Sequence, residues 1–236
     1  MNNPIIFVSL GPGDPELITL KGLRALQEAE VILTPATRSS NNTVASRSKD
    51  IITSLEIDHS KIELFYVPMS RMRQATIDAY QQVAAKANGL ANKGLKVVIT
   101  AEGDAAFYSS AQYIEEMLWE MGAQTSRVAG VPAFIDCARL ASTHIVNQDT
   151  SFEVIARVES PEVLTHAMNQ DKSIVLMKIS QWEESIKAVI AQSHSHTFHY
   201  VESCGVDGKE FYTCDKEVIL DRKFPYFAII LIKQEA

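Results

Sequence analysis

The sequence predicts an α/β protein built from two α/β domains. Short β-branched runs alternate with longer segments at helical spacing through the first part of the chain. The runs at 5–9 and 96–100 are almost continuously apolar, as parallel strands covered on both faces are. Beyond residue 147 strands dominate. We therefore expect an N-terminal domain, residues 1–147, with a mostly parallel sheet and crossover helices, and a C-terminal domain, residues 148–236, with a mixed or antiparallel sheet.

In the N-terminal domain each expected strand is followed by an expected helix. The strands are expected at residues 5–9, 31–34, 62–67 and 96–100, and the helices at residues 20–29, 44–55, 75–91 and 110–121. A glycine turn at 129–134 is expected to open one more helix of small residues. This alternation is typical of parallel strands joined by helical crossovers.

The C-terminal domain has more strands than helices. Strands are expected at residues 152–158, 174–178, 198–202, 210–213 and 226–232, and helices at residues 161–168 and 182–192. The turn Gly205-Val206-Asp207-Gly208 separates two of these strands, so they are expected to pair in antiparallel fashion.

Composition and charge exclude several classes of protein. The 236 residues are 46% hydrophobic and 22% charged, as in soluble globular proteins, and the net charge of -7 disfavours nucleic acid as a partner. No apolar stretch reaches the roughly 20 residues of a membrane helix, and the first residues lead us to expect no secretory signal. The three cysteines include no C-x-x-C pair, which favours a reducing cytoplasm and gives no support to a disulfide framework.

The loop after the first expected strand, Gly11-Pro12-Gly13-Asp14-Pro15-Glu16, allows a ligand to approach the backbone closely. It is not a Rossmann fingerprint, because Glu16 stands where the third glycine is needed, and no Gly-Lys-Ser/Thr follows as a phosphate loop requires. The carboxylates of Asp14 and Glu16 would repel a pyrophosphate but tolerate a cationic or polyhydroxyl ligand. A purely structural turn is the alternative interpretation.

Two more loops are expected at the same edge of the sheet. Residues 102–110 follow the apolar strand 96–100, and the turn 129–134 lies further along the chain. Open α/β sheets bind their ligands at the carboxyl ends of the strands, so the three loops are expected to converge around one crevice.

Residues 11–26, GPGDPELITLKGLRAL, resemble the opening of the tetrapyrrole methylases. The loop that begins Glu102-Gly103-Asp104 is similar to the second conserved loop of that family, and Tyr108-Ser109 most resembles the branch that methylates C20 of precorrin-2 or cobalt-factor II. Shorter blocks at residues 67–69, 130–132, 176–178 and 225–228 are similar to further blocks of the family, which occur in the same order. The chain departs from the family pattern at three positions: Ala105 replaces proline, Pro132 replaces serine or threonine, and Ser203 replaces arginine.

The resemblance implies a two-domain, usually homodimeric, cytoplasmic enzyme that binds S-adenosylmethionine in a cleft between its domains and methylates a carbon of a tetrapyrrole. It implies cofactor contacts for Pro12, Glu102, Gly103, Asp104, Phe107, Pro132, Ala133, Met177, Cys204, Tyr226 and Ala228. The acidic loops suit this cationic cofactor, and its ribose offers hydroxyls to Asp104. We assign no catalytic base from the sequence.

Contacts to the substrate are expected from residues that suit a carboxylate-rich macrocycle. Arginines pair with carboxylates and methionines face apolar rings; the candidates are Met69, Arg71, Arg73, Tyr108 and Ser109. The alternative is a solvated helix start for the arginines, core positions for the methionines and a turn for Tyr108 and Ser109. No metal site is expected, because His194, His196 and His199 read more simply as part of an exposed loop.

We interpret the chain as a C20-methyltransferase of cobalamin biosynthesis. Other branches of the family remain open, acting on a different ring carbon, on the diphthamide precursor or on ribosomal RNA, although RNA favours a basic surface. A non-catalytic sensor of tetrapyrrole or S-adenosylmethionine is the alternative from another class.

Overall fold

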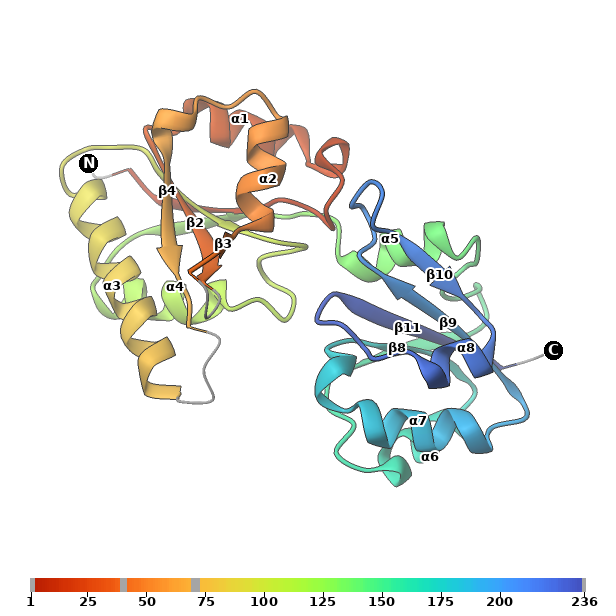
Figure 1. The fold of residues 1–236 in the computed structure, drawn as a ribbon. Helices are drawn as coiled ribbons and strands as arrows, with labels where there is room; N and C mark the ends of the chain where they lie inside the picture. Colours follow the sequence, from red (N-terminus) through yellow and green to blue (C-terminus); the bar gives the residue numbers. More distant parts are fainter. Residues whose placement is uncertain (1–2, 39–41, 69–72, 235–236) are drawn as a thin grey trace. The chain divides into compact units, whose positions relative to one another are not determined.

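The computed structural model describes residues 3–38, 42–68 and 73–234, and the chain divides into two compact units, Met1–Ala133 and Phe134–Ala236 (Figure 1). This division lies before the boundary at residue 147 that the sequence suggests. Residues after Ala133 belong with the second unit because the Phe134 ring packs 6.2 Å from that of Phe152, and Arg139 donates to Glu210 at 3.0 Å. Each unit is described by itself below.

The first unit is built on a six-stranded sheet. Its parallel strands lie in the order β4-β2-β5-β1-β6, and the short β3 pairs antiparallel with the end of β2. The strands are β1 (Ile5–Ser9), β2 (Val31–Arg38), β3 (Val44–Ala45), β4 (Ile62–Tyr66), β5 (Val97–Ala101) and β6 (Thr125–Val128). The helices are η1 (Pro15–Leu17), α1 (Leu20–Glu28), α2 (Arg47–Ser54), η2 (His59–Lys61), α3 (Arg73–Ala91) and α4 (Ala111–Glu120).

Helices cover both faces of this sheet, which explains why its central strands are apolar throughout (Figure 1). On one face Phe7 and Ile99 pack with side chains of α3 and α4. On the other face Val8 and Val98 pack with side chains of α1 and α2. Neighbouring residues of β1 and β5 thus point into opposite cores, and the two strands lie side by side in the middle of the sheet.

The second unit holds a five-stranded sheet in the order β10-β9-β11-β8-β7. Only β7 and β8 are parallel, so the expected mixed sheet is confirmed, as is the antiparallel pairing of β9 with β10. The strands are β7 (Ser151–Ile155), β8 (Lys172–Leu176), β9 (His196–Glu202), β10 (Phe211–Thr213) and β11 (Ala228–Gln234). The helices are α5 (Ala133–Leu140), α6 (Pro161–Met168), η3 (Ile179–Gln181), α7 (Glu183–Gln192) and α8 (Lys216–Asp221).

The main core of the second unit lies between its sheet and the helices α6, α7 and α8. Phe198 and Tyr200 of β9 point into this core and are fully buried. The residue between them, His199, points to the other face, as does Phe152 of β7. Helix α5 packs on that second face, where Phe134 contacts Phe152 and Cys137 contacts Cys204.

One expected helix, residues 44–55, is wrong at its beginning. Val44 and Ala45 form β3, and α2 begins only after Ser46. The Ser46 hydroxyl accepts from the Lys49 backbone N–H at 3.1 Å and donates to the Pro35 carbonyl at 2.6 Å. This N-cap ends the strand and starts the helix within three residues. Among the described residues no helix has both the length and the apolar character that crossing a membrane requires.

Candidate active site

The loops after β1 and β5 are bonded to each other at the carboxyl edge of the first sheet. Leu10 N–H donates to the Ala101 carbonyl at 2.8 Å. Gly11 and Gly103 then exchange both backbone bonds, at 3.1 Å and 2.7 Å. Both glycines have left-handed backbones, with φ of 82° and 64°, which other residues rarely adopt. The glycines that the sequence analysis singled out therefore join two loops into one rigid rim.

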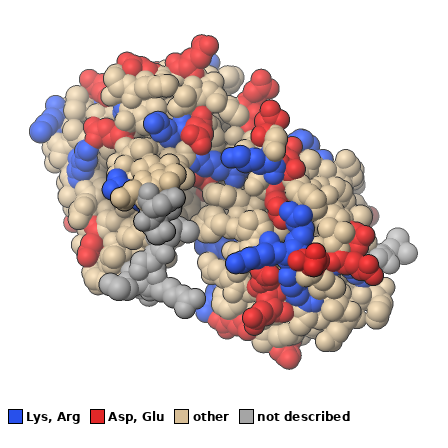
Figure 2. Space-filling view, in the orientation of Figure 1, with Lys and Arg blue, Asp and Glu red and all other residues tan. Residues whose placement is uncertain are grey.

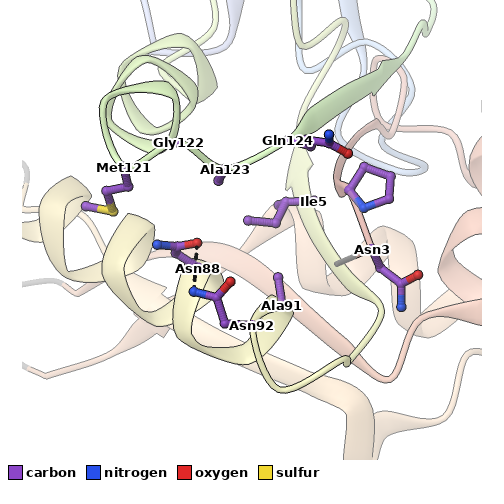
Figure 3. Close-up of a pocket in the computed structure, with 10 residues that line it drawn as sticks. Asn3, Ile5, Asn88, Ala91, Asn92, Met121, Gly122, Ala123 and Gln124 are labelled. Atoms are coloured by element: carbon purple, nitrogen blue, oxygen red, sulfur yellow. Dashed lines mark hydrogen bonds between the residues drawn. The ribbon is translucent and has the colours of Figure 1, made fainter. Parts of the chain in front are cut away.

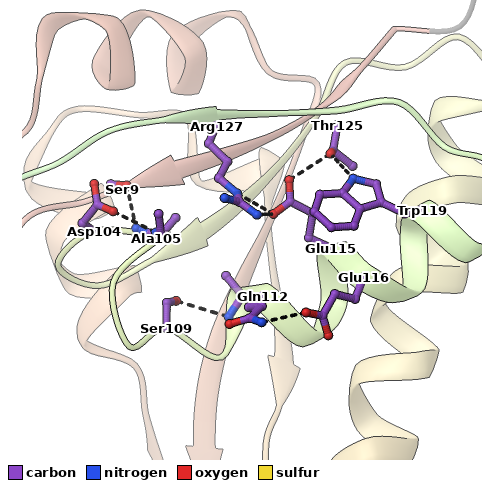
Figure 4. A network of polar contacts seen from close by, with 12 residues as sticks. Ser9, Asp104, Ala105, Ser109, Gln112, Glu115, Glu116, Trp119, Thr125 and Arg127 are labelled. Carbon is purple, nitrogen blue, oxygen red and sulfur yellow. Dashed lines mark hydrogen bonds and ion pairs between the residues drawn. The ribbon is translucent and has the colours of Figure 1, made fainter. Parts of the chain in front are cut away.

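The third loop is fastened to this rim by Asp104 and by close packing at Gly130. One oxygen of Asp104 accepts from Gly130 N–H at 2.7 Å. The Ser9 hydroxyl accepts from Ala105 N–H at 2.9 Å (Figure 4). A Cβ on Gly130 would lie 2.4 Å from the Ser9 Cβ and 2.8 Å from the Gly103 carbonyl oxygen. The predicted convergence of the three loops is confirmed.

Asp104 has a role that the sequence did not indicate. Its second oxygen accepts from Ala106 N–H at 2.8 Å, so both oxygens bind backbone groups of the loops. Its established partners are therefore the second and third loops. Each carboxylate oxygen accepts more than one donor, so a ribose hydroxyl remains a proposed additional partner. Asp14 is similar, because its carboxylate accepts from Glu16 N–H at 2.9 Å and begins η1.

The N-terminus of α2 adds two residues that the sequence analysis missed. Arg47 donates to the carbonyl of the buried Pro12 at 2.5 Å, and Ser48 donates to the Glu102 carboxylate at 3.3 Å. Burial raises the pKa of Glu102, while the Arg47 charge and the Ser48 hydrogen bond act in the opposite direction. The sequence held one signal for these two contacts: Ser46, the N-cap residue that fixes where α2 begins.

Phe107, Tyr108 and Ser109 form the outer part of the second loop. The rings of Phe107 and Tyr108 are edge to face, with centroids 4.9 Å apart. Tyr108 has a left-handed backbone with φ of 50°, and 48% of it is exposed. The Ser109 hydroxyl accepts from Ala111 N–H at 3.2 Å at the start of α4, so it stabilises the turn. Tyr108 thus presents an aromatic ring to solvent beside the rim.

The second unit gathers its four predicted cofactor residues at one edge of its own sheet. Met177 follows β8, Cys204 follows β9, and Tyr226 and Ala228 stand at the start of β11. These ends coincide because β11 runs antiparallel to both neighbours, with Ala228 opposite Glu202. Tyr226 is 61% exposed, whereas the Cys204 and Ala228 side chains are buried. Cys204 and Ala228 therefore offer mainly backbone groups to a ligand at this edge.

The remaining candidates divide into two groups. Met69 and Arg71 lie outside the described residues, as does the side chain of Arg73, whose backbone begins α3. The expected exposed loop at His194, His196 and His199 is wrong for the latter two, because β9 begins at His196. His196 Nε2 lies 3.1 Å from the Met168 carbonyl oxygen, and His199 Nδ1 lies 2.9 Å from the Tyr212 hydroxyl. Over the described ranges, no three metal-ligating side chains form a group.

A hollow of about 760 Å³ lies at the opposite, amino edge of the first sheet (Figure 3). It is lined by Asn3, Pro4, Ile5, Asn88, Ala91, Asn92, Met121, Gly122, Ala123 and Gln124. It contains no residue of the three glycine loops and no ionisable side chain among this lining. The carboxyl edge, where carboxylates and left-handed glycines meet, is thus the stronger candidate.

Comparison with known proteins identifies what this arrangement belongs to. The family model of the Tetrapyrrole (Corrin/Porphyrin) Methylases matches residues 4–217, which include all three loops and most of the second unit. The chain belongs to this family. Tetrapyrrole methylases take their methyl group from S-adenosylmethionine, as the resemblance implied.

Individual tetrapyrrole methylases match along their whole length. The cobalt-precorrin-2 C(20)-methyltransferase of Salmonella typhimurium is 26% identical, with 100% of this chain and 98% of the relative covered. The precorrin-2 C(20)-methyltransferase of a Sinorhizobium species is 24% identical over 97% and 94%. Among solved structures, a cobalt precorrin-4 methyltransferase superposes with a TM-score of 0.69 at 20% identity, covering 97% of this chain and 94% of that one. The superposition shows the shared two-sheet fold.

Proposed function

We propose that this tetrapyrrole methylase transfers a methyl group from S-adenosylmethionine to C20 of precorrin-2 or cobalt-factor II in cobalamin biosynthesis. The observation that carries the methyl transfer is the rigid acidic rim in which Asp104 and two left-handed glycines hold three loops together. The choice of C20 rests on Tyr108-Ser109 and on full-length similarity to two C20-methyltransferases.

The rim suits the chemistry of this cofactor better than that of a nucleotide phosphate. Glu102 and Asp104 supply carboxylate charge, and neither a phosphate-loop lysine nor a run of free glycine amides accompanies them. These carboxylates therefore attract a positively charged sulfonium or amino group. We assign cofactor contacts to Pro12, Glu102, Gly103, Asp104, Phe107, Pro132 and Ala133 in the first unit, and to Met177, Cys204, Tyr226 and Ala228 in the second.

Contacts to the donor from residues of each unit are part of this proposal. S-adenosylmethionine supplies an electrophilic methyl group on a cationic sulfur. The chain contributes alignment, because in-line displacement needs the acceptor carbon behind the breaking bond and no nucleophilic side chain. The linked loops hold the donor in one position, and exposed Tyr108 and Tyr226 are placed to stack on apolar ligand surface. Met69, Arg71, Arg73, Tyr108 and Ser109 are the proposed contacts to the macrocycle.

The same proposal includes a cytoplasmic homodimer that needs no nucleic acid. Acidic and basic side chains are intermingled on the face shown in Figure 2, and the net charge is -7. On that face the mixture of charges gives no extended basic track for RNA phosphates. Analytical ultracentrifugation is expected to give twice the mass of one chain; a monomer at micromolar concentration would contradict the dimer.

The decisive experiment supplies methyl-labelled S-adenosylmethionine with either metal-free or cobalt-containing substrate. Label is expected at C20 of one of the two products, located by NMR. Label on another carbon would replace the C20 assignment by another branch of the family. Saturable donor binding in calorimetry without any product in a single turnover would instead identify a non-catalytic sensor.

A further inference from the structure

Two cysteines of the second unit lie in direct contact although they are 67 residues apart. Cys137 Sγ is 3.0 Å from Cys204 Sγ, and both side chains are buried, at 1% and 5% exposure. A disulfide needs a sulfur separation of about 2.0 Å, so the two sulfurs are about 1 Å from bonding distance. Cys137 lies on α5, and Cys204 lies in the turn after β9.

A polar cluster fixes the same two segments to each other, independently of the sulfurs. Arg139 of α5 donates to Asp136 at 2.5 Å and to Glu210 at 3.0 Å. Glu210 in turn accepts from Gly205 N–H at 2.8 Å, directly after Cys204. The thiols therefore face each other from segments that are already held together, which reduces the entropy lost when they are joined.

We propose that Cys137 and Cys204 form a reversible disulfide that weakens binding of the methyl donor. Hydrogen peroxide serves as the two-electron oxidant. One thiol attacks the peroxide to give a sulfenic acid and water; the other thiol attacks that sulfur, the S–S bond forms, and a second water leaves. A dithiol returns the pair to two thiols.

The position of Cys204 links this bond to function. Ser203 N–H donates to the Phe227 carbonyl at 2.8 Å, so the turn that carries Cys204 also adjoins the Tyr226–Ala228 segment. Closing the sulfur separation draws this turn towards α5. Because a displacement of about 1 Å in a binding site has large effects, we expect donor affinity to fall about tenfold. This second effect rests on the proposed function, whereas the disulfide itself does not.

The test for the bond uses the full chain treated with hydrogen peroxide and then digested without reduction. The expected result is a fall from three titratable thiols to one, and a Cys137–Cys204 linked peptide in the mass spectrum. Cys214→Ser is the matched control, because Cys214 is exposed and should leave the linked peptide unchanged. Cys137→Ser should abolish it. Three thiols that persist, or links formed only through Cys214, would overturn the proposal.

Calorimetry with S-adenosylmethionine then compares the reduced and oxidised proteins. The expected tenfold loss of donor affinity on oxidation should be reversed by dithiothreitol and should be absent in Cys137→Ser. A linked peptide with unchanged affinity would overturn the switch. If the reduced protein binds no S-adenosylmethionine, the proposed function fails, and the mass spectrum still decides the disulfide.

Discussion

Gly130 shows most directly how single residues shape the candidate site. A Cβ at this position would approach the Ser9 Cβ to 2.4 Å, whereas a Cβ on Gly89 of α3 would meet nothing within 4 Å. Gly130→Ala is therefore expected to lower the free energy of unfolding by about 1–3 kcal/mol, and Gly89→Ala to raise it by about 0.5–1 kcal/mol. Urea denaturation measures both. Equal changes in unfolding free energy for the two variants would contradict the close packing of the third loop at Gly130.

Glu102 gives the site a pH dependence whose sign follows from its environment. Its pKa is raised chiefly by burial, so the folded protein favours the protonated form more than the unfolded chain does. The associated stability is present below the ordinary glutamate pKa and is lost as pH rises through the raised value. Glu102→Gln should therefore be more stable than the parent at pH 7.

The difference between Glu102→Gln and the parent should shrink as pH falls below the ordinary pKa of glutamate, since both side chains are then neutral. Unfolding curves at pH 7 and pH 4 test this, and Asp58→Asn, at an exposed turn where the pKa is lowered, is expected to show the opposite sign. If the difference in unfolding free energy between Glu102→Gln and the parent widens towards pH 4, the carboxyl group is not buried as described.

At the scale of elements, Arg139 ties α5 to the β9–β10 turn through its hydrogen bond to Glu210. Asp136 is 2% exposed, and one of its oxygens accepts from Arg139, while the other has no hydrogen-bond partner among the described residues. Arg139→Ala leaves this carboxylate buried without its cation, so a loss of about 1–3 kcal/mol is expected in urea unfolding. The double variant Asp136→Asn/Arg139→Ala should recover part of the loss; a double variant as unstable as the sum of both single variants would contradict the coupling.

The strength of the local pattern determined which elements were predictable from sequence. Strand β1 was predicted with its observed bounds because it is apolar and ends at a glycine loop. Strand β6 was missed because it is a polar, largely exposed edge strand, and α8 was missed because it has only six residues. The prediction for β2 stopped before Pro35, but the strand continues to Arg38. The pairing with β5 ends at Leu33, so at Pro35 the strand pairs, within the described ranges, only with β4, as at a sheet edge where proline is tolerated.

The loops of the candidate site were predictable from the sequence, but the hydrogen bonds that join them were not. Glycines at strand ends indicated where a ligand approaches, since parallel strands end at one edge. The bond from Asp104 to Gly130 and the approach of Arg47 to Pro12 join residues distant in sequence. No local pattern encodes such contacts, because they depend on which strands are neighbours in the sheet.

At the scale of the whole molecule, the two units each contain one tryptophan, Trp119 in the first and Trp182 in the second. Trp182→Phe leaves fluorescence from the first unit only, and Trp119→Phe leaves fluorescence from the second. If both units hold the methyl donor, a donor concentration of 100 times its Kd should raise the free energy of unfolding by about 2.7 kcal/mol, whichever tryptophan is followed. A shift confined to one reporter, measured against the same variant without ligand, would place the site in one unit.

The paired bonds between Gly11 and Gly103 imply that the rim has its final shape before any ligand arrives. Amide protons locked in such a bridge exchange slowly with deuterated water, so these two should be protected in the ligand-free protein. If the methyl donor binds at this rim, as proposed, its binding costs little ordering entropy in this part of the chain. The affinity for the donor would then depend on how well the donor fits this fixed surface.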